Sequence, residues 1–268
     1  MTSTELLAKN IRRSALEMVH RAKASHIASA LSISDLIAVL YGEIMHIDPT
    51  NENLSNRDRF ILSKGHACAA VYAALAHIGF IPLVQLETYG DDHSWLMNHI
   101  SHKVVGVEFS SGSLGHGLPF GVGKTLAAKI RKENWRTFVL LSDGEMDEGA
   151  NWEALMFAAH HKLSHLTAII DYNKLQSLDS VANTLGLEPL VNKLEAFGCA
   201  VQEIDGHDHQ QIALALMTTH FEKPTVIVAH TIKGKGVSFM ENRVEWHYKN
   251  PSDTQLQEAI VQLGVGNA

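Results

Sequence analysis

Apolar positions in the first third of the chain recur at helical spacing, and they predict three helices. Residues 5–22 read as an amphipathic helix, and the small-residue stretch AKASHIASA that follows reads as a loop. Ser34 or Asp35 is the expected N-cap of a second helix over DLIAVLYGEIM. A third, apolar helix, ACAAVYAALAHIGF, follows the segment LSKGHA. Residues 80–111, rich in His, Gly and Ser, are expected to be irregular and to line a surface or a site.

From residue 117 onward, apolar runs of strand length alternate with helical patterns. Strands are expected at 137–142, 166–173, 200–205 and 224–230, and helices at 117–133, 149–162, 209–220 and 254–264. Strand, helix and strand at this spacing make a βαβ unit, which implies a parallel sheet. The prediction is therefore an α/β fold, a doubly wound parallel sheet with helices on both faces, in a single domain over residues 1–268.

Composition narrows the classes of protein that fit this pattern. The chain has 268 residues, 46% of them hydrophobic, and a formal net charge of −7, which disfavours nucleic acid and anionic membranes as partners. The apolar runs read as too short to span a membrane, and the N-terminus does not resemble a signal peptide, so we expect a cytoplasmic protein. The two cysteines, Cys68 and Cys199, show no disulfide or metal spacing and are expected to be buried small residues.

The stretch GHGLPFGVGKT, residues 115–125, ends like a phosphate-binding P-loop. The P-loop pattern needs a glycine five positions before Gly123, but Leu118 stands there. Pro119 would also remove one amide from the phosphate cradle. We therefore reject an ATPase on this motif.

Two polar residues follow neighbouring predicted strands and suggest a metal site. Asp143 ends one strand, and Asn173 ends the next strand thirty residues later. The carboxyl ends of parallel strands open into the ligand crevice, so these side chains should face one another. Their oxygens suit Mg²⁺ or Ca²⁺, and Gly144 would let a bulky anion approach the backbone. The alternative is two ordinary turn residues at strand ends.

The surrounding segments resemble the thiamine-diphosphate enzymes, whose fingerprint is G-D-G followed about thirty residues later by N. Here Ser142 replaces the first glycine. Within that superfamily the chain is similar to transketolases, because six segments occur in the transketolase order: LSKGHA, GVEFSSGSLGHG, DGEMDEGANWE, DYNKLQ, DGHD, and KGKGVSFMEN followed by WH. They span nearly the whole chain and correspond to the N-terminal, diphosphate-binding half of the family.

The resemblance assigns roles to the matching residues. It implies that a metal is bound by Asp143, Asn173 and the Leu175 carbonyl, and that the aminopyrimidine of thiamine diphosphate is lined by Gly112, Ser113 and Leu114. His66 and His247 would contact the diphosphate or the substrate, and His26 and His99 would face the substrate. Glu148, with Glu153, would lie at a dimer interface that links two active sites.

Two departures bear on these assignments. His116 stands where many transketolases carry Gln, and His102 competes with His99 for its position. Histidines at the reaction centre fit ketol transfer, which needs proton movement near neutral pH. His160, His161 and His165 are expected to be ordinary polar residues near a helix end, and His207 is expected to be a turn or capping residue.

The resemblance also implies a partner, because the family's catalytic glutamate belongs to a second, pyrimidine-binding domain. We expect a separate C-terminal subunit to supply it, in an α2β2 assembly. The implied reaction moves a two-carbon ketol group from a ketose phosphate to an aldose phosphate, with pentose phosphates as the default sugars. The alternatives are the α subunit of a 2-oxo acid dehydrogenase and a non-catalytic thiamine-diphosphate-binding protein.

Overall fold

A five-stranded parallel sheet organises residues 1–264, the part of the chain that the computed structural model describes. Its strands lie in the order β1-β2-β3-β5-β4, and every neighbouring pair is parallel. The prediction of a parallel α/β sheet is confirmed. The strands are β1 (Arg59–Leu62), β2 (Thr137–Ser142), β3 (Leu166–Tyr172), β4 (Ala200–Asp205) and β5 (Thr225–His230).

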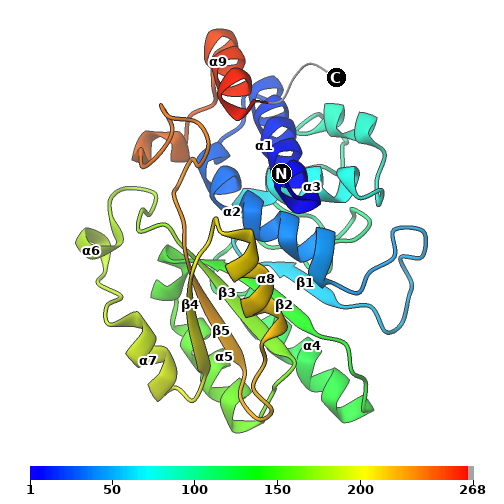
Figure 1. The fold of residues 1–268 in the computed structure, drawn as a ribbon, viewed down its shortest axis with the longest axis vertical. Helices are drawn as coiled ribbons and strands as arrows, with labels where there is room; N and C mark the ends of the chain where they lie inside the picture. The colour runs from blue at the N-terminus through cyan, green and yellow to red at the C-terminus, as the bar shows by residue number, and fades with distance from the viewer. Residues whose placement is uncertain (265–268) are drawn as a thin grey trace.

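Helices cover both faces of this sheet (Figure 1). Phe138 and Leu140 of β2 pack into a core shared with α1, α2, α3, α8 and α9, while Val139 and Leu141 pack on the opposite face with α4, α5 and α7. The alternation of strand side chains thus produces two separate hydrophobic layers. The helices are α1 (Ser3–Arg21), α2 (Ile27–Val39), α3 (Cys68–His77), α4 (Gly117–Arg131), α5 (Gly149–His160), α6 (Val181–Thr184), α7 (Leu190–Ala196), α8 (His209–Met217) and α9 (Asp253–Leu263).

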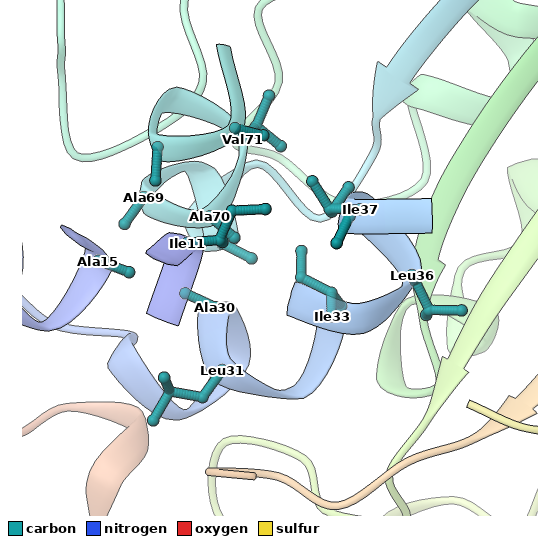
Figure 2. Packing of buried hydrophobic residues seen from close by; sticks show 14 of the residues in the cluster. Ile11, Ala15, Ala30, Leu31, Ile33, Leu36, Ile37, Ala69, Ala70 and Val71 are labelled. Carbon is teal, nitrogen blue, oxygen red and sulfur yellow. The ribbon is translucent and has the colours of Figure 1, made fainter. Parts of the chain in front are cut away.

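Helix α2 begins eight residues earlier than the sequence predicted. It starts at Ile27, so Ser34 and Asp35 lie inside it and neither caps it. The stretch AKASHIASA was interpreted as a loop because its residues are small. In the structure, small side chains such as Ala30 allow α2 to pack closely against α1 and α3 (Figure 2). Tertiary packing therefore decides this boundary, and capping preference does not.

Helix α2 also changes one expectation about membranes. With the π-helical turn Leu40–Ile44 it forms an apolar segment, Ile27–Ile44, that is long enough to cross a membrane, so the expectation that no apolar run reaches that length was wrong. In the structure 89% of this segment is buried among the other elements. It is the central helix of one hydrophobic layer (Figure 2).

Strand β1 was not predicted, and neither were the short helices α6 and α7. Only four residues form β1, and three of them are buried, so the strand has no polar alternation to reveal it. It pairs with β2 from Arg59 opposite Thr137 to Leu62 opposite Leu140, and this pairing places Ser63 and Lys64 at the same sheet edge as Asp143. Residues 80–111 are largely irregular, as expected, apart from a 3-10 helix at Leu83–Thr88.

Two glycines of α4 provide a matched test of how tightly this helix packs on β2. A Cβ at Gly121 would lie 2.5 Å from the Val139 side chain, whereas a Cβ at Gly123 would meet nothing within 4 Å. We expect Gly121→Ala to destabilise the protein by about 1–3 kcal/mol through overpacking. Gly123→Ala should stabilise it by up to about 1 kcal/mol through helix propensity. Urea unfolding of both variants measures this, and equal effects would contradict it.

Candidate active site

One cavity lies at the carboxyl ends of β1, β2, β3 and β5, and it gathers most of the predicted site residues. Its volume is about 260 Å³. Ten of the residues proposed from the sequence line it: His26, His66, His99, Gly112, Leu114, Asp143, Gly144, Asn173, Leu175 and His247. Further lining residues are Ser29, Lys64, Ser142, Gln176, Ser177, Lys233 and Tyr248. Segments from residue 26 to residue 248 thus meet in one place.

The three predicted metal ligands lie on two neighbouring connections. Asp143 follows β2, and its carboxylate accepts hydrogen bonds from the amides of Gly144, at 2.7 Å, and Lys174, at 2.6 Å. Asn173 follows β3, and its Oδ1 accepts from the Leu175 amide at 3.1 Å. A Cβ on Gly144 would meet the Gln176 side chain at 3.0 Å, so glycine keeps the two connections close.

The chemistry of this donor set fits a hard cation. Burial, and then the nearby charge of Asp171, raises the pKa of Asp143 to about 7, so the carboxyl group lacks a positive partner. Asp143, Asn173 and the Leu175 carbonyl offer only oxygen atoms, as Mg²⁺ and Ca²⁺ require. The described residues contain no cluster of three His, Cys, Asp or Glu that could hold a metal. An amide and a carbonyl must therefore complete any site at Asp143.

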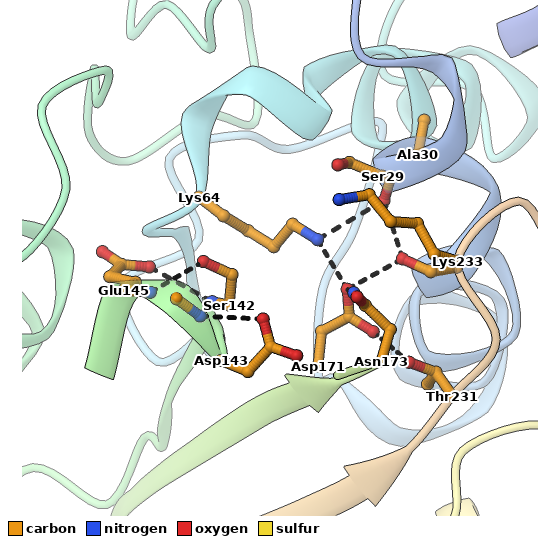
Figure 3. Close-up of polar contacts among 12 residues, drawn as sticks. Ser29, Ala30, Lys64, Ser142, Asp143, Glu145, Asp171, Asn173, Thr231 and Lys233 are labelled. Atoms are coloured by element: carbon orange, nitrogen blue, oxygen red, sulfur yellow. Dashed lines mark hydrogen bonds and ion pairs between the residues drawn. The ribbon is translucent and has the colours of Figure 1, made fainter. Parts of the chain in front are cut away.

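A buried ion pair supports the floor of the cavity (Figure 3). Lys64 Nζ lies 2.6 Å from Asp171 Oδ2, and both side chains are fully buried. Asp171 also accepts from Ser32 at 2.7 Å, from Asn173 Nδ2 at 3.0 Å and from Thr231. Burial alone would raise the pKa of Asp171, but Lys64 and these donors hold it below its usual value. Because Asp171 holds Asn173 Nδ2, it turns Asn173 Oδ1 toward the Leu175 side.

Lys233, from the connection after β5, brings a second ammonium group into the cavity. Its Nζ donates to the carbonyls of Leu175, at 2.8 Å, and Gln176, at 2.9 Å, and lies 3.2 Å from His247 Nδ1. Burial, and then the charge of Lys64, lowers its pKa to about 8. The Leu175 carbonyl is thus already oriented toward a positive charge. Two lysines in one cavity also suit a ligand that carries several negative charges.

Four histidines form one wall of the cavity. The ring centroid of His26 lies 5.0 Å from that of His66, 5.8 Å from that of His99 and 4.8 Å from that of His247. His26 has a left-handed backbone, with φ of 72°, and its amide donates to the His247 carbonyl at 2.9 Å. Its Nδ1 is buried with no hydrogen-bond partner among the described residues. An unpaired buried nitrogen at this position is available to a ligand.

These histidines are neutral near pH 7. Burial, and then the charges of His99 and Lys233, lowers the pKa of His26 to about 4. Burial and Lys233 lower the pKa of His247 to about 3, and burial, followed by Lys64, takes that of His66 well below its usual value. Burial also lowers the pKa of His99. Neutral imidazoles can accept or donate a proton toward a substrate hydroxyl.

The lowered pKa values predict a loss of stability on acidification. An unfolded histidine binds a proton as the pH falls through about 6.5, whereas folded His26 does so only near pH 4. Stability that is present above pH 6.5 is therefore lost as the pH falls toward 4. In denaturant unfolding at pH 7 and pH 5, His26→Asn/His247→Asn should lose less stability than the wild type. The exposed His160→Asn is the control, and a double variant as pH-sensitive as the wild type would contradict the prediction.

Glu145 organises the glycine-rich segment beside the cavity. This fully buried carboxylate accepts from the Gly115 amide at 3.0 Å and from the Ser63 hydroxyl. Its own amide donates to Ser142 Oγ at 3.1 Å, so the serine that replaces the family's first glycine has a structural partner. Burial raises the pKa of Glu145 even though these hydrogen bonds oppose the shift. Glu145 thus ties residues 112–115 to β1 and β2.

Several candidates lie outside the cavity lining. Ser113 and Glu148 are exposed, and so are Glu153 and His116. His116 precedes α4, and its Nδ1 lies 3.0 Å from the Leu114 carbonyl oxygen. His102 bonds to Ser110 and lines a different cavity, so the structure places His99, and not His102, beside His26. The two cysteines are free and buried, as expected.

The sequence reasoning assigned no role to Lys64, Asp171 or Lys233. Two of the three stood inside motifs that were quoted, LSKGHA and KGKG. The available signal was Asp171, a carboxylate at the end of the apolar run LTAIIDY. A charge in a buried strand requires a counter-ion. Which lysine supplies it depends on the fold.

Comparisons with known proteins agree with this geometry. Residues 3–267 match a family model described as the thiamine diphosphate binding domain of transketolase. One of the two chains of an apulose-4-phosphate transketolase from Phocaeicola vulgatus is 39% identical over 97% of this chain and 93% of its own length. A 6-deoxy-6-sulfo-D-fructose transketolase subunit from a Clostridium species is 39% identical over 96% of this chain and 94% of its own length.

Solved transketolases share the fold. The crystal structure of transketolase from Campylobacter jejuni superposes with a TM-score of 0.91 at 29% identity, over 98% of this chain. The match covers 43% of that protein, so the chain spans less than half the length of this transketolase. Human transketolase is 33% identical over 95% of this chain and 41% of its own length. The chain therefore belongs to the transketolase family, as a member that matches the family's thiamine-diphosphate-binding domain.

Proposed function

We propose that this chain is the diphosphate- and metal-binding subunit of a two-subunit transketolase, acting as a single domain. It would take part in moving a two-carbon ketol group from a ketose phosphate to an aldose phosphate. One observation carries the proposal: a single cavity joins a set of oxygen donors, two lysines and four neutral histidines. Metal, anion and proton-transfer functions are thus available within one site.

In this proposal the metal is Mg²⁺ or Ca²⁺, held by Asp143, Asn173 Oδ1 and the Leu175 carbonyl. Lys233 lies beside that carbonyl and would balance the charge of the diphosphate. Gly112, Ser113 and Leu114, with Gly144, would lie along the cofactor. The bound thiamine diphosphate supplies the carbanion and electron sink that ketol transfer needs.

The four histidines would act on the sugar. His26, His66, His99 and His247 share one wall, so neighbouring hydroxyl groups of a sugar can meet more than one imidazole. Because their pKa values are lowered, each can accept a hydroxyl proton near pH 7 without first losing one. They would orient the sugar and move protons at its hydroxyl oxygens.

The proposed partner is a separate C-terminal subunit that supplies the catalytic glutamate, in an α2β2 assembly. Relatives named as transketolase subunits match this chain along nearly their full length, which supports a two-chain enzyme. Glu148 and Glu153 are exposed at the start of α5, and Met156 and Phe157 on that helix are exposed as well. This surface is suited to the subunit contact that the resemblance gives to the two glutamates. The free thiols of Cys68 and Cys199 fit the cytoplasm, where we place the protein.

The sugars are the most open part of the proposal. Pentose phosphates are the default for the family, but the similar proteins include one named for apulose 4-phosphate and one named for a sulfonated fructose. A panel of donors should therefore contain a pentose phosphate, a branched ketose phosphate and a sulfonated ketose. The 2-oxo acid dehydrogenase and binding-protein alternatives receive no support from these relatives.

The test is purification of the tagged chain from its host with thiamine diphosphate and Mg²⁺ present. The recovered complex would be assayed for ketol transfer with the donor panel, beside the lone chain. A partner that confers transfer activity on an inactive chain supports the proposal. Oxidation of a 2-oxo acid by the complex would replace it with the dehydrogenase alternative. Cofactor binding with no partner and no transfer would favour a binding protein.

A further inference from the structure

A polar cluster lies behind the cavity, around a buried carboxylate in the middle of α2. Asp35 is 5% exposed. Its Oδ2 lies 2.5 Å from Arg12 Nη2 and 2.7 Å from His207 Nδ1, and its Oδ1 lies 3.2 Å from His209 Nε2. Burial alone would raise the pKa of Asp35, but the two histidines and the Arg12 guanidinium hold it well below the usual value. The carboxylate is therefore a fixed negative anchor.

His207 differs from His209 in what its other nitrogen does. The backbone amide of Ile232 donates to His207 Nε2 at 2.8 Å. A backbone N–H can only donate, so Nε2 is unprotonated and Nδ1 carries the proton that goes to Asp35. The orientation of the ring is thereby defined at both ends. His209 Nδ1 instead lies 2.9 Å from Thr4 Oγ1, on α1.

Ile232 precedes the lysine that enters the cavity. Lys233 belongs to the connection TIKGKG after β5, and this connection is held from the same side along its length. Gly234 N donates to the Ala28 carbonyl at 3.0 Å, and Arg12 Nε donates to the Lys235 carbonyl at 3.2 Å. Of these contacts, the bond to His207 lies immediately before Lys233. It fixes the peptide plane from which the lysine side chain departs.

We propose that His207 is a positioning residue, which links Asp35 of α2 to the Ile232 amide and so directs the Lys233 ammonium into the cofactor cavity. The sequence had suggested a turn or capping role for His207, but Asp208 caps α8 instead. The site of action rests on the proposed function, since Lys233 would meet the cofactor diphosphate. The link between His207 and the connection rests on the structure alone.

Three variants separate positioning from general stability. His207→Asn places an amide near the former Nδ1 and can keep the bond to Asp35, but it is too short to reach the Ile232 amide. His207→Gln can present an acceptor further out and should restore much of the contact. His209→Asn is the matched control, because it alters a bond to the same carboxylate without touching residues 231–236.

The first measurement is amide hydrogen exchange over residues 230–236 in the full chain without cofactor. In His207→Asn we expect the Ile232 amide to exchange about tenfold faster than in the wild type, with His209→Asn unchanged. Equal acceleration in both variants, or in neither, would overturn the inference. If His207→Asn does not fold, the wild type still decides. A fast-exchanging Ile232 amide there would show that the bond is not held.

The second measurement is thiamine diphosphate affinity, with Mg²⁺, in the complex recovered with the partner. His207→Asn should raise Kd about tenfold, His207→Gln should recover most of that loss, and His209→Asn should match the wild type. A wild-type complex that does not bind thiamine diphosphate would refute the proposed function and leave the exchange result standing. Normal wild-type binding with an unchanged Kd in His207→Asn would refute the positioning role.

Discussion

Asp143→Asn will abolish metal-dependent cofactor binding while leaving the free protein at least as stable as the wild type. The carboxylate is buried near Asp171, and its pKa is raised to about 7, so its negative charge opposes folding without a cation. Asparagine removes that charge and keeps the shape. It also removes the one charged ligand of the proposed metal site, so affinity should fall by more than about 100-fold, the upper range for losing an outer-shell partner.

Thermal unfolding without metal and titration of thiamine diphosphate in the reconstituted complex measure the two effects separately. Asp179→Asn is the control, because Asp179 lies on the connection after β3 and is exposed outside the cavity. It should change neither quantity. An Asp143→Asn protein that binds the cofactor normally would remove the metal from the proposal. One that is strongly destabilised would instead assign the carboxylate a structural role.

Lys64→Met will lower the free energy of unfolding by about 3–5 kcal/mol, because it leaves the Asp171 charge buried without its cation. Lys64 and Asp171 are 1% and 0% exposed, and their charged atoms lie 2.6 Å apart. The remaining donors to Asp171, from Ser32, Asn173 and Thr231, are neutral and do not replace the charge. Denaturant unfolding at pH 7 gives the size of the loss.

Lys162 and Glu222 provide a control of equal geometry. Their charged atoms also lie 2.6 Å apart, but their side chains are 58% and 46% exposed. Lys162→Met should therefore cost less than about 1 kcal/mol. Adding Asp171→Asn to Lys64→Met should recover part of the loss, since no uncompensated charge remains. Similar losses from the two lysines would show that burial does not control this pair.

The parallel sheet was predictable because its strands are short apolar runs separated by helical patterns. Strand β3 shows why: LTAIIDY is buried on both faces and reads as a strand without any alternation. Strand β1 has the same character but only four residues, too few to distinguish from the start of a helix. The start of α2 was missed because small residues serve both loops and closely packed helices.

The site was predictable where residues follow strands and less so where partners come from distant segments. Asp143 and Asn173 end adjacent strands, so the topology of the sheet brings them together. Lys64, Asp171 and Lys233 meet only after three separate connections have folded to the same sheet edge. Sequence shows that the Asp171 charge needs a partner, but only packing selects Lys64. The same limit applies to His207, whose contact with Asp35 joins residues that are 172 positions apart.

The bond from the His26 amide to the His247 carbonyl has a consequence for biosynthesis. The sheet and the oxygen donors can assemble while a nascent chain is still growing, because β1 to β5 end at His230. The histidine wall cannot close until His247 has left the ribosome. A product terminated between these two residues would carry a nearly finished sheet beside an open, partly apolar hollow, which is the kind of species that chaperones retain and proteases remove.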